Sequence, residues 1–188
     1  GGAAERREDG VAIYCTNPRC FVQDREAILH AARAFEIDGI GPATIALLLE
    51  QGLISMPSDL FTLLVGDVSG LEGLGELSAN KLIDEIQSRK NISLAKFILA
   101  LGIKNVGEQT AIDLASQFKN LDAFVSASFE DLIVVEGIGS TVAESVRSFL
   151  DEERNQKLLS DYIDNGIVIE QQNVSSSIEA ISGKTFVV

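Results

Sequence analysis

The chain has 188 residues, a formal net charge of −13, and 46% hydrophobic but only 6% aromatic residues. That length fits one domain of ordinary size or two small ones, and a Trp-free composition rich in Leu, Ile, Ala and Val favours packed helices over a β-sandwich. No apolar run approaches the roughly 20 residues of a membrane span, and no secretion signal is visible, so we expect a cytoplasmic protein. The negative charge argues against non-specific attraction to nucleic acids.

Both cysteines, Cys15 and Cys20, lie in residues 1–23, a segment without helical periodicity. The stretch CTNPRC places them on either side of an Asn-Pro turn, which can direct two thiolates towards one metal ion. Structural zinc takes four ligands, and the only histidine, His30, lies in a helical pattern where a packed or solvent-facing imidazole is more common than a ligand. We therefore interpret the segment as half of a zinc site, metal-free in this chain, whose other half would precede Gly1.

Four stretches repeat along the chain: DGIGPATIALLL from Asp38, EGLGELSANKLI from Glu72, KNVGEQTAIDLA from Lys104 and EGIGSTVAESVR from Glu136. Their second glycines fall at positions 41, 75, 107 and 139, so the spacings are 34, 32 and 32 residues. One G-x-G is a weak signal because glycine occurs in many turns, but four copies at nearly constant spacing indicate a repeated structural unit.

Helical patterns flank every copy. DREAILHAARAF precedes the first copy, and SLAKFILAL, with Ser93 as its N-cap, precedes the third. Further helices are predicted from Pro57, Asn120, Ser128 and Asn155. The sequence therefore predicts a mainly α-helical domain over residues 24–170, with helix–turn–helix units near 35–52, 68–90, 97–119 and 132–152.

The C-terminal residues differ from this pattern. Residues 171–180 are polar and are predicted to form a linker, and the β-prone run ISGKTFVV at 181–188 is predicted to be the first strand of a truncated further domain. No convincing strand is predicted before it.

The G-x-G turns carry the functional hypothesis. The first glycine permits a backbone conformation that is unfavourable for residues with a Cβ, and the second allows a ligand to approach closely. The following helix offers unpaired N–H groups and the positive end of its dipole, so a phosphate can bind there without lysine. Such contacts place a protein on a DNA backbone without reading its sequence. The candidate binding turns are Gly39, Ile40 and Gly41; Gly73, Leu74 and Gly75; Asn105, Val106 and Gly107; and Gly137, Ile138 and Gly139.

Ordinary tight turns that allow two helices to pack closely would give the same pattern, and this alternative stays open for single copies. Asn105 replaces the first glycine of the third copy and adopts the left-handed region less freely. Glu76 and Glu108 follow second glycines, where a carboxylate suits the helix dipole but would repel a phosphate. We therefore expect the four turns to contribute unequally.

Residues 35–152 hold seven Lys or Arg against eighteen Asp or Glu, so any affinity for DNA should be weak, independent of sequence and sensitive to salt. No phosphate-binding loop, nucleophile elbow or metalloprotease motif is present. The acidic clusters at 129–131 and 151–153 fit solvated helix ends better than an acid–base pair. We expect no catalytic residue in this chain.

Taken in order, these stretches resemble the C-terminal half of bacterial NAD+-dependent DNA ligases. YCTNPRCFVQ is similar to the second half of that family's four-cysteine zinc finger, and HAARAFEIDGIG to the junction with its first helix-hairpin-helix motif. FILALGIKNVGEQTA is the most specific match, VEGIGSTVAESVRSF resembles the fourth motif, and ISGKTFVV resembles the first strand of the family's BRCT domain. The resemblance covers about Gly10 to Val188 and departs from the family at Phe21, where a proline is usual.

The resemblance implies a compact bundle of four tandem helix-hairpin-helix motifs, of the SAM/RuvA-like kind, after an irregular partial zinc knuckle. It implies a parent enzyme that seals nicks in duplex DNA with NAD+, Mg2+ and Zn2+, in which this part grips the backbone from the minor-groove side. Lys104, Lys81 and Arg147 would add positive charge near the turns. The chain alone would be inactive and bind no cofactor, its partners would be nicked duplex DNA and other domains of the ligase, and its location would be the bacterial cytoplasm, at the nucleoid.

Two alternatives remain. An acidic helical module that docks a basic protein would need no affinity for DNA. A helix-hairpin-helix unit from another repair or recombination factor need not carry both the cysteine pair and the final β-prone run.

Overall fold

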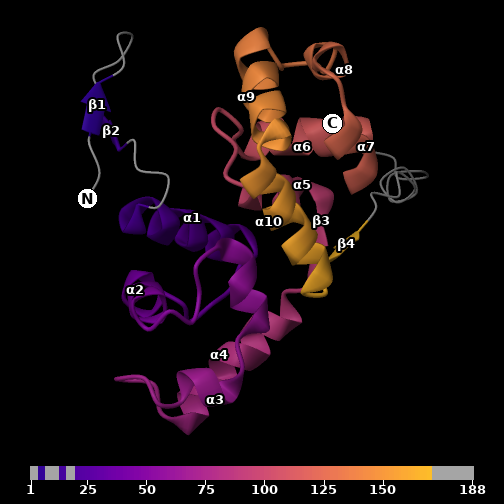
Figure 1. Ribbon diagram of the computed structural model, residues 1–188. Coiled ribbons are helices and arrows are strands. Elements are labelled where there is room, and N and C mark those ends of the chain that lie inside the picture. The colour runs from indigo at the N-terminus through magenta and orange to yellow at the C-terminus, as the bar shows by residue number, and fades with distance from the viewer. Residues whose placement is uncertain (1–3, 7–12, 16–19, 171–188) are drawn as a thin grey trace, which may run out of the picture.

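Helices form most of the chain that the computed structural model describes, which comprises residues 4–6, 13–15 and 20–170 (Figure 1). The prediction of a mainly α-helical fold is confirmed. In chain order the elements are β1 (Ala4–Arg6), β2 (Ile13–Cys15), α1 (Phe21–Ala34), α2 (Pro42–Glu50), the 3-10 helix η1 (Pro57–Thr62), α3 (Val65–Val68), α4 (Glu76–Ser88), β3 (Asn91–Ser93), α5 (Leu94–Ala100), α6 (Glu108–Phe118), α7 (Leu121–Ser126), α8 (Phe129–Ile133), α9 (Ser140–Asp151), α10 (Glu153–Asp164) and β4 (Val168–Glu170).

The short strands were not predicted. β1 pairs with β2 in antiparallel orientation, inside the segment that we expected to be irregular. β3 pairs with β4 in parallel orientation, with Ile92 opposite Ile169, and so joins the start of α5 to the end of α10. Strands of three residues are too short for an alternation of apolar and polar side chains to be recognised in the sequence.

Each repeat forms a helical hairpin: hairpin 1 is α1–α2, hairpin 2 is α3–α4, hairpin 3 is α5–α6 and hairpin 4 is α8–α9. The first helices of hairpins 2 and 4 begin at Val65 and Phe129, upstream of the predicted starts at 68 and 132. In hairpin 2 the helical pattern is masked by Gly66 and Gly70, because glycine is a poor helix former. The helix predicted from Pro57 is a 3-10 helix, and the last helix begins two residues before Asn155.

The hairpins correspond in pairs. In hairpins 1 and 3 the first helix is longer and is followed by a left-handed residue, Glu36 (φ 57°) or Gly102 (φ 65°). In hairpins 2 and 4 the first helix is short and begins with an aspartate cap. Asp67 Oδ2 accepts from the Leu64 N–H, and Asp131 Oδ2 accepts from the Ser128 N–H, both at 2.9 Å. The chain therefore repeats a tandem of two hairpins, which we call pair A (hairpins 1 and 2) and pair B (hairpins 3 and 4).

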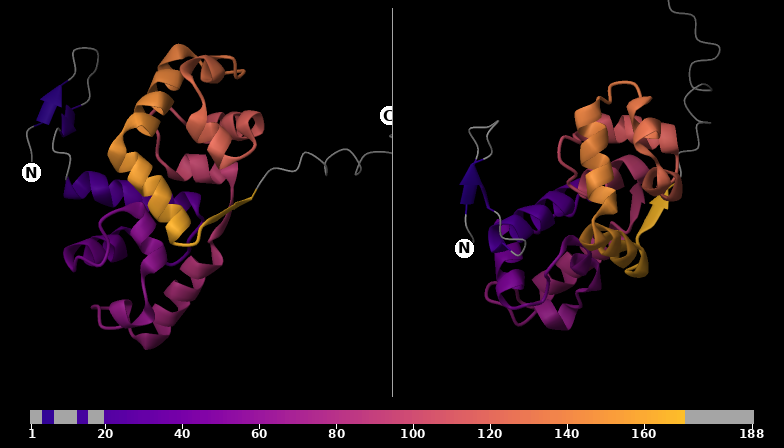
Figure 2. Two further views of the ribbon diagram at one scale, coloured as in Figure 1. Left: turned by 45° about the vertical axis from the view of Figure 1, so that its right-hand side comes forward. Right: turned by 45° about the horizontal axis from the view of Figure 1, so that its top comes forward.

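An aromatic cluster joins the two pairs. Phe35 follows α1 of pair A, and Phe61 lies in η1. Phe97 lies in α5 of pair B, and Tyr162 lies in α10. Tyr162 stacks on Phe35 at a centroid distance of 5.6 Å and meets Phe97 edge-on at 5.4 Å. The two pairs lie at opposite ends of the molecule, with α10 running between them (Figures 1 and 2). α10 therefore supplies the side chain on which both pairs pack.

Burial of the Tyr162 side chain changes the pKa of its hydroxyl. Its side chain is fully buried, and among the described residues its hydroxyl has no hydrogen-bond partner. Loss of hydration, with a smaller effect of the nearby Asp59 carboxylate, raises the pKa of Tyr162 far above its usual value.

No helix in the described part of the chain is both long enough and apolar enough to cross a bilayer.

Candidate nucleic-acid interface

The four repeated turns share one backbone shape. Their first residues, Gly39, Gly73, Asn105 and Gly137, all have a left-handed backbone, with φ of 80°, 81°, 64° and 82°. In turns 2, 3 and 4 the N–H of the middle residue donates to the carbonyl three residues earlier, at 3.0–3.1 Å. A β-turn with a left-handed third residue requires glycine or asparagine there. Local geometry therefore explains the first glycine of each turn.

The middle residues hold the turns to the protein. Ile40 and Ile138 are buried, and Leu74 and Val106 are half-buried. Their apolar side chains pack against the core. At Ile40 and Ile138 the buried side chain is therefore not available to an external ligand.

The second glycines have a different environment. Gly41, Gly75, Gly107 and Gly139 are the N-caps of α2, α4, α6 and α9, with ordinary φ values between −114° and −76°. A Cβ built on any of them would meet nothing within 4 Å. Neither the backbone nor the packing of the protein therefore requires glycine at these four positions.

These glycines also leave the helix ends without side-chain caps. None of the four N-cap residues makes a side-chain cap hydrogen bond, although Ser, Thr, Asn or Asp would stabilise a helix at this position. The first N–H groups of each helix thus face outward beside a bare glycine. A helix end of this kind is suited to an anion that approaches the backbone closely.

The four helix ends differ in charge. Pro42 removes one N–H from the first turn of α2, and Glu76 and Glu108 place a carboxylate in the first turns of α4 and α6. The first turn of α9 has no acidic residue and begins with Ser140 and Thr141. Hairpin 4 is therefore the one whose helix N-terminus has neither a first-turn carboxylate nor a proline.

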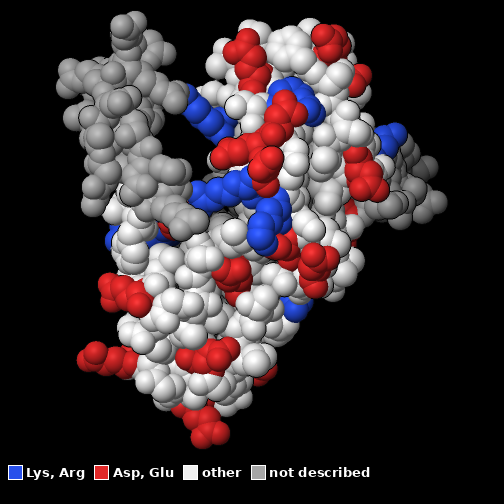
Figure 3. Space-filling view, in the orientation of Figure 1, with Lys and Arg blue, Asp and Glu red and all other residues white. Residues whose placement is uncertain are grey.

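Basic side chains near the turns are few. Arg147 is not available, because its guanidinium donates to the Ala127 carbonyl at 2.8 Å and pairs with Asp151. Lys104 and Lys81 are exposed, and within the described residues neither has a carboxylate within 4 Å. On the face shown in Figure 3, acidic side chains are widely scattered and basic ones gather towards the middle. Of the three predicted basic residues, two remain free to meet a phosphate.

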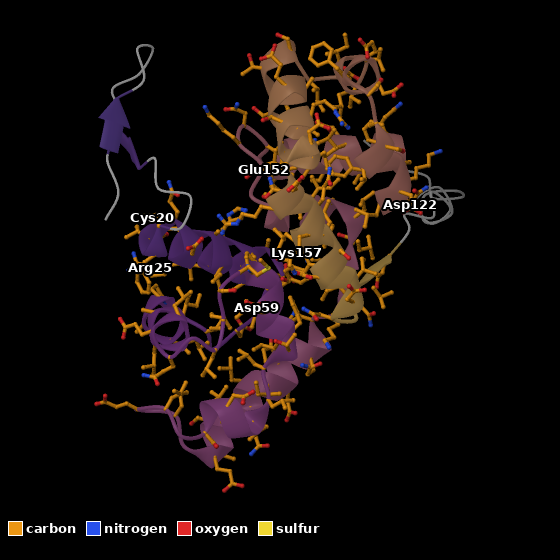
Figure 4. All side chains as sticks on the ribbon, in the orientation of Figure 1. Cys20, Arg25, Asp59, Asp122, Glu152 and Lys157 are labelled. Carbon is orange, nitrogen blue, oxygen red and sulfur yellow. The ribbon has the colours of Figure 1, made fainter. Side chains whose placement is uncertain are left out.

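Of the two predicted metal ligands, only Cys20 has a side chain that the structure describes. Cys20 is half-buried at the N-cap of α1 (Figure 4), and Cys15 lies in β2, where its side chain is outside the described part. In the part of the chain that the structure describes, no group of three or more His, Cys, Asp or Glu could hold a metal ion. His30 is packed, with Nε2 2.7 Å from the Leu99 carbonyl oxygen, as expected for a residue that is not a ligand. The half zinc site, which needs the undescribed side chain of Cys15, stays a prediction, and the predicted linker and strand at 171–188 lie outside the described residues.

A pocket of about 400 Å³, which no pattern in the sequence indicates, lies between α1, the third turn and the α9–α10 junction. Arg154 at the start of α10 reaches Asp24 of α1 at 2.8 Å beside this pocket. The two residues lie far apart in the sequence, so local patterns could not bring them together. The ion pair fixes α1 against the beginning of α10.

Two family models match the chain where the pairs lie. A SAM-like helix-hairpin-helix tandem matches residues 33–88, within pair A, and a helix-hairpin-helix motif matches residues 96–159, which contain most of pair B. The chain is thus a helix-hairpin-helix protein, as the turn geometry and fold indicate.

Similar proteins narrow this class further. Proteins named DNA ligase are 38% identical over 185 residues in Desulforudis audaxviator, 36% over 190 in Pelotomaculum thermopropionicum and 36% over 182 in Natronomonas pharaonis. These matches cover 97%, 100% and 95% of this chain but only 28%, 28% and 26% of the ligases. The chain is thus similar to these DNA ligases over nearly all of its own length, and it spans little more than a quarter of theirs.

Proposed function

We propose that this chain is the part of a bacterial NAD+-dependent DNA ligase that binds the backbone of duplex DNA, and that it has no catalytic residues of its own. The observation that carries the proposal is the set of second glycines, Gly41, Gly75, Gly107 and Gly139. Each is a helix N-cap where the protein itself has room for a side chain. A ligand that approaches the backbone closely explains glycine at all four.

A phosphate is the ligand that fits this arrangement. A hydrogen bond from a backbone N–H to a phosphate oxygen needs a distance of about 2.7–3.2 Å, and a side chain on the N-cap would compete for the same N–H groups. The helix dipole adds attraction without a net positive charge. Contacts of this type are independent of base sequence, which suits an enzyme that joins any nicked strand.

The excess of acidic residues limits the affinity of this chain for DNA. Residues 35–152 hold seven basic against eighteen acidic residues, so long-range attraction to DNA is unfavourable. In the proposed whole enzyme, other domains of the same ligase would hold the duplex and supply NAD+ and Mg2+ chemistry, and zinc would be bound by a complete cysteine set. The turns described here would then position the minor-groove side of the duplex in the bacterial cytoplasm.

The test removes the space beside the helix ends while preserving the helices. In a variant with Gly75→Ser, Gly107→Ser and Gly139→Ser, each serine caps its helix and places an oxygen where the phosphate would bind. We expect affinity for a nicked duplex, measured by fluorescence anisotropy in about 50 mM salt, to fall by roughly tenfold or more, with unequal contributions from the three turns. Thermal stability should stay equal or rise, since serine is the better cap.

Gly66→Ser is the matched control, because Gly66 is exposed in α3 and also has open space around its Cα. This variant should bind DNA as the unchanged chain does. Unchanged affinity in the folded triple variant would contradict the proposal. Binding of a basic protein without any affinity for nicked DNA at low salt would instead support the acidic docking module.

A further inference from the structure

The third turn differs from the others in its first residue, and a contact accompanies the difference. Asn105 has a left-handed backbone (φ 64°), where turns 1, 2 and 4 have glycine. Asparagine tolerates this conformation less well than glycine does. Its side-chain Nδ2 donates to Oγ of Ser145 at 2.9 Å. Because Ser145 lies in α9, the amide connects the turn of hairpin 3 to the second helix of hairpin 4.

Ser145 is itself held in one orientation. Its Oγ donates to the carbonyl of Thr141, one helical turn earlier, at 2.9 Å. With its hydrogen used in this way, the hydroxyl has lone pairs left to accept from the asparagine amide. Thr141 is the second residue of α9, two positions after the last glycine of turn 4. Two hydrogen bonds in series therefore connect the third turn to the start of the helix behind the fourth turn.

Pair A also has a polar link between its two hairpins, made by different groups and one helical turn further along the second helix. The backbone N–H of Asp38, just before turn 1, donates to Oε1 of Glu85 in α4 at 3.3 Å. Arg89 holds the same oxygen at 2.8 Å through its Nε. In both pairs, then, the turn of the first hairpin is attached to the second helix of the second hairpin.

We propose that Asn105 is a positioning residue, whose amide holds the third turn against α9 so that the third and fourth turns meet neighbouring phosphates as one unit. This inference rests on the proposed binding of a DNA backbone by these turns. Asn105 is exposed and Ser145 is half-buried, so the bond adds little to folding stability. Its loss should therefore appear in DNA affinity and not in the melting temperature.

The test uses four single variants and one double variant of the full chain. Asn105→Gly removes the amide and restores the residue best suited to a left-handed backbone, and Ser145→Ala removes the acceptor. Ser145→Thr keeps the hydroxyl and should preserve binding. Ser148→Ala is the matched control, because Ser148 lines the same hollow beside Asn105 and Ser145 but does not bond to Asn105. The double variant combines Asn105→Gly with Ser145→Ala.

Asn105→Gly and Ser145→Ala should each weaken nicked-duplex binding about three- to tenfold in low salt, and the double variant should bind no more weakly than either, because both remove one bond. Without DNA, the NMR signals of the Asn105 side-chain amide should shift in Ser145→Ala and stay in place in Ser148→Ala. Losses that multiply in the double variant would overturn the inference. So would unchanged affinity in both single variants while Gly107→Ser and Gly139→Ser still weaken binding, a result that would leave the proposed function intact. Failure of the unchanged chain to bind DNA would instead overturn the proposed function itself.

Discussion

The two glycines of each turn have separate roles. Gly73 needs glycine for its own backbone, since its φ of 81° is left-handed, whereas Gly75 has a φ of −76° that any residue can adopt. Both have open space around the Cα. The first glycine is thus required by folding, and the second is available for function.

This division predicts opposite effects on stability in hairpin 2. Gly73→Ala should lower the free energy of unfolding by about 1–2 kcal/mol, because the new Cβ strains the left-handed backbone. Gly75→Ser should leave that free energy unchanged or slightly higher. Urea denaturation of both variants measures the difference. Equal destabilisation by the two substitutions would argue against separate roles.

At the scale of single elements, capping chemistry sets where the short helices begin. The predicted N-cap Ser93 is confirmed, and Asn120 and Ser128, where helices were predicted to start, are N-caps as well; each accepts from the backbone N–H three residues later. A cap can be read from the sequence because it depends on residues only three positions apart. By contrast, α3 begins after Leu64, which has no capping side chain, and no helix was predicted to start there.

The cap of α8 should make stability depend on pH. Hydrogen bonds from the Ser128 hydroxyl, and then from its backbone N–H, lower the pKa of Asp131 below its ordinary value of 3.8. A lowered native pKa stabilises the folded state above the unfolded value, and this contribution is lost as pH falls through the native pKa. Asp131→Ala should therefore melt at a lower temperature than the unchanged chain at pH 7. The gap should shrink below about pH 4, and a gap independent of pH would exclude this origin.

At the scale of the whole molecule, Tyr162 controls the junction between pairs A and B. Burial raises its pKa above the ordinary value of 10.0, so the native state keeps the hydroxyl proton where the unfolded chain loses it. Stability from this group is complete below the unfolded pKa and falls as pH rises beyond it.

Tyr162→Phe should remove this alkaline loss. At pH 7 the variant should be as stable as the unchanged chain or up to about 1–3 kcal/mol more stable, because it no longer buries a hydroxyl without a partner. Above about pH 10 its advantage should grow. Thermal melts of both proteins across this range test the prediction, and a constant difference between them would contradict it.

The sequence by itself determined the local features of this protein. Several helix caps and the left-handed first residues of the turns depend on interactions within a few positions of the chain. The spacing of the second glycines can be read from the sequence directly. Together these features identify the candidate backbone sites. The family resemblance, which the similar proteins confirm, also follows from these stretches.

Only the tertiary structure decided how the hairpins combine. Three features join residues that lie up to 127 positions apart in the sequence. They are the grouping into pairs A and B, the bond from Asn105 to Ser145, and the cluster of Phe35, Phe61, Phe97 and Tyr162. Helical periodicity specifies which face of a helix is apolar but not which partner covers it. Helical periodicity could not show that the Arg147 guanidinium bonds to the Ala127 carbonyl and to Asp151. Nor could it show that the second glycines have open space around the Cα. Those facts depend on distances between elements, which packing of the whole core sets.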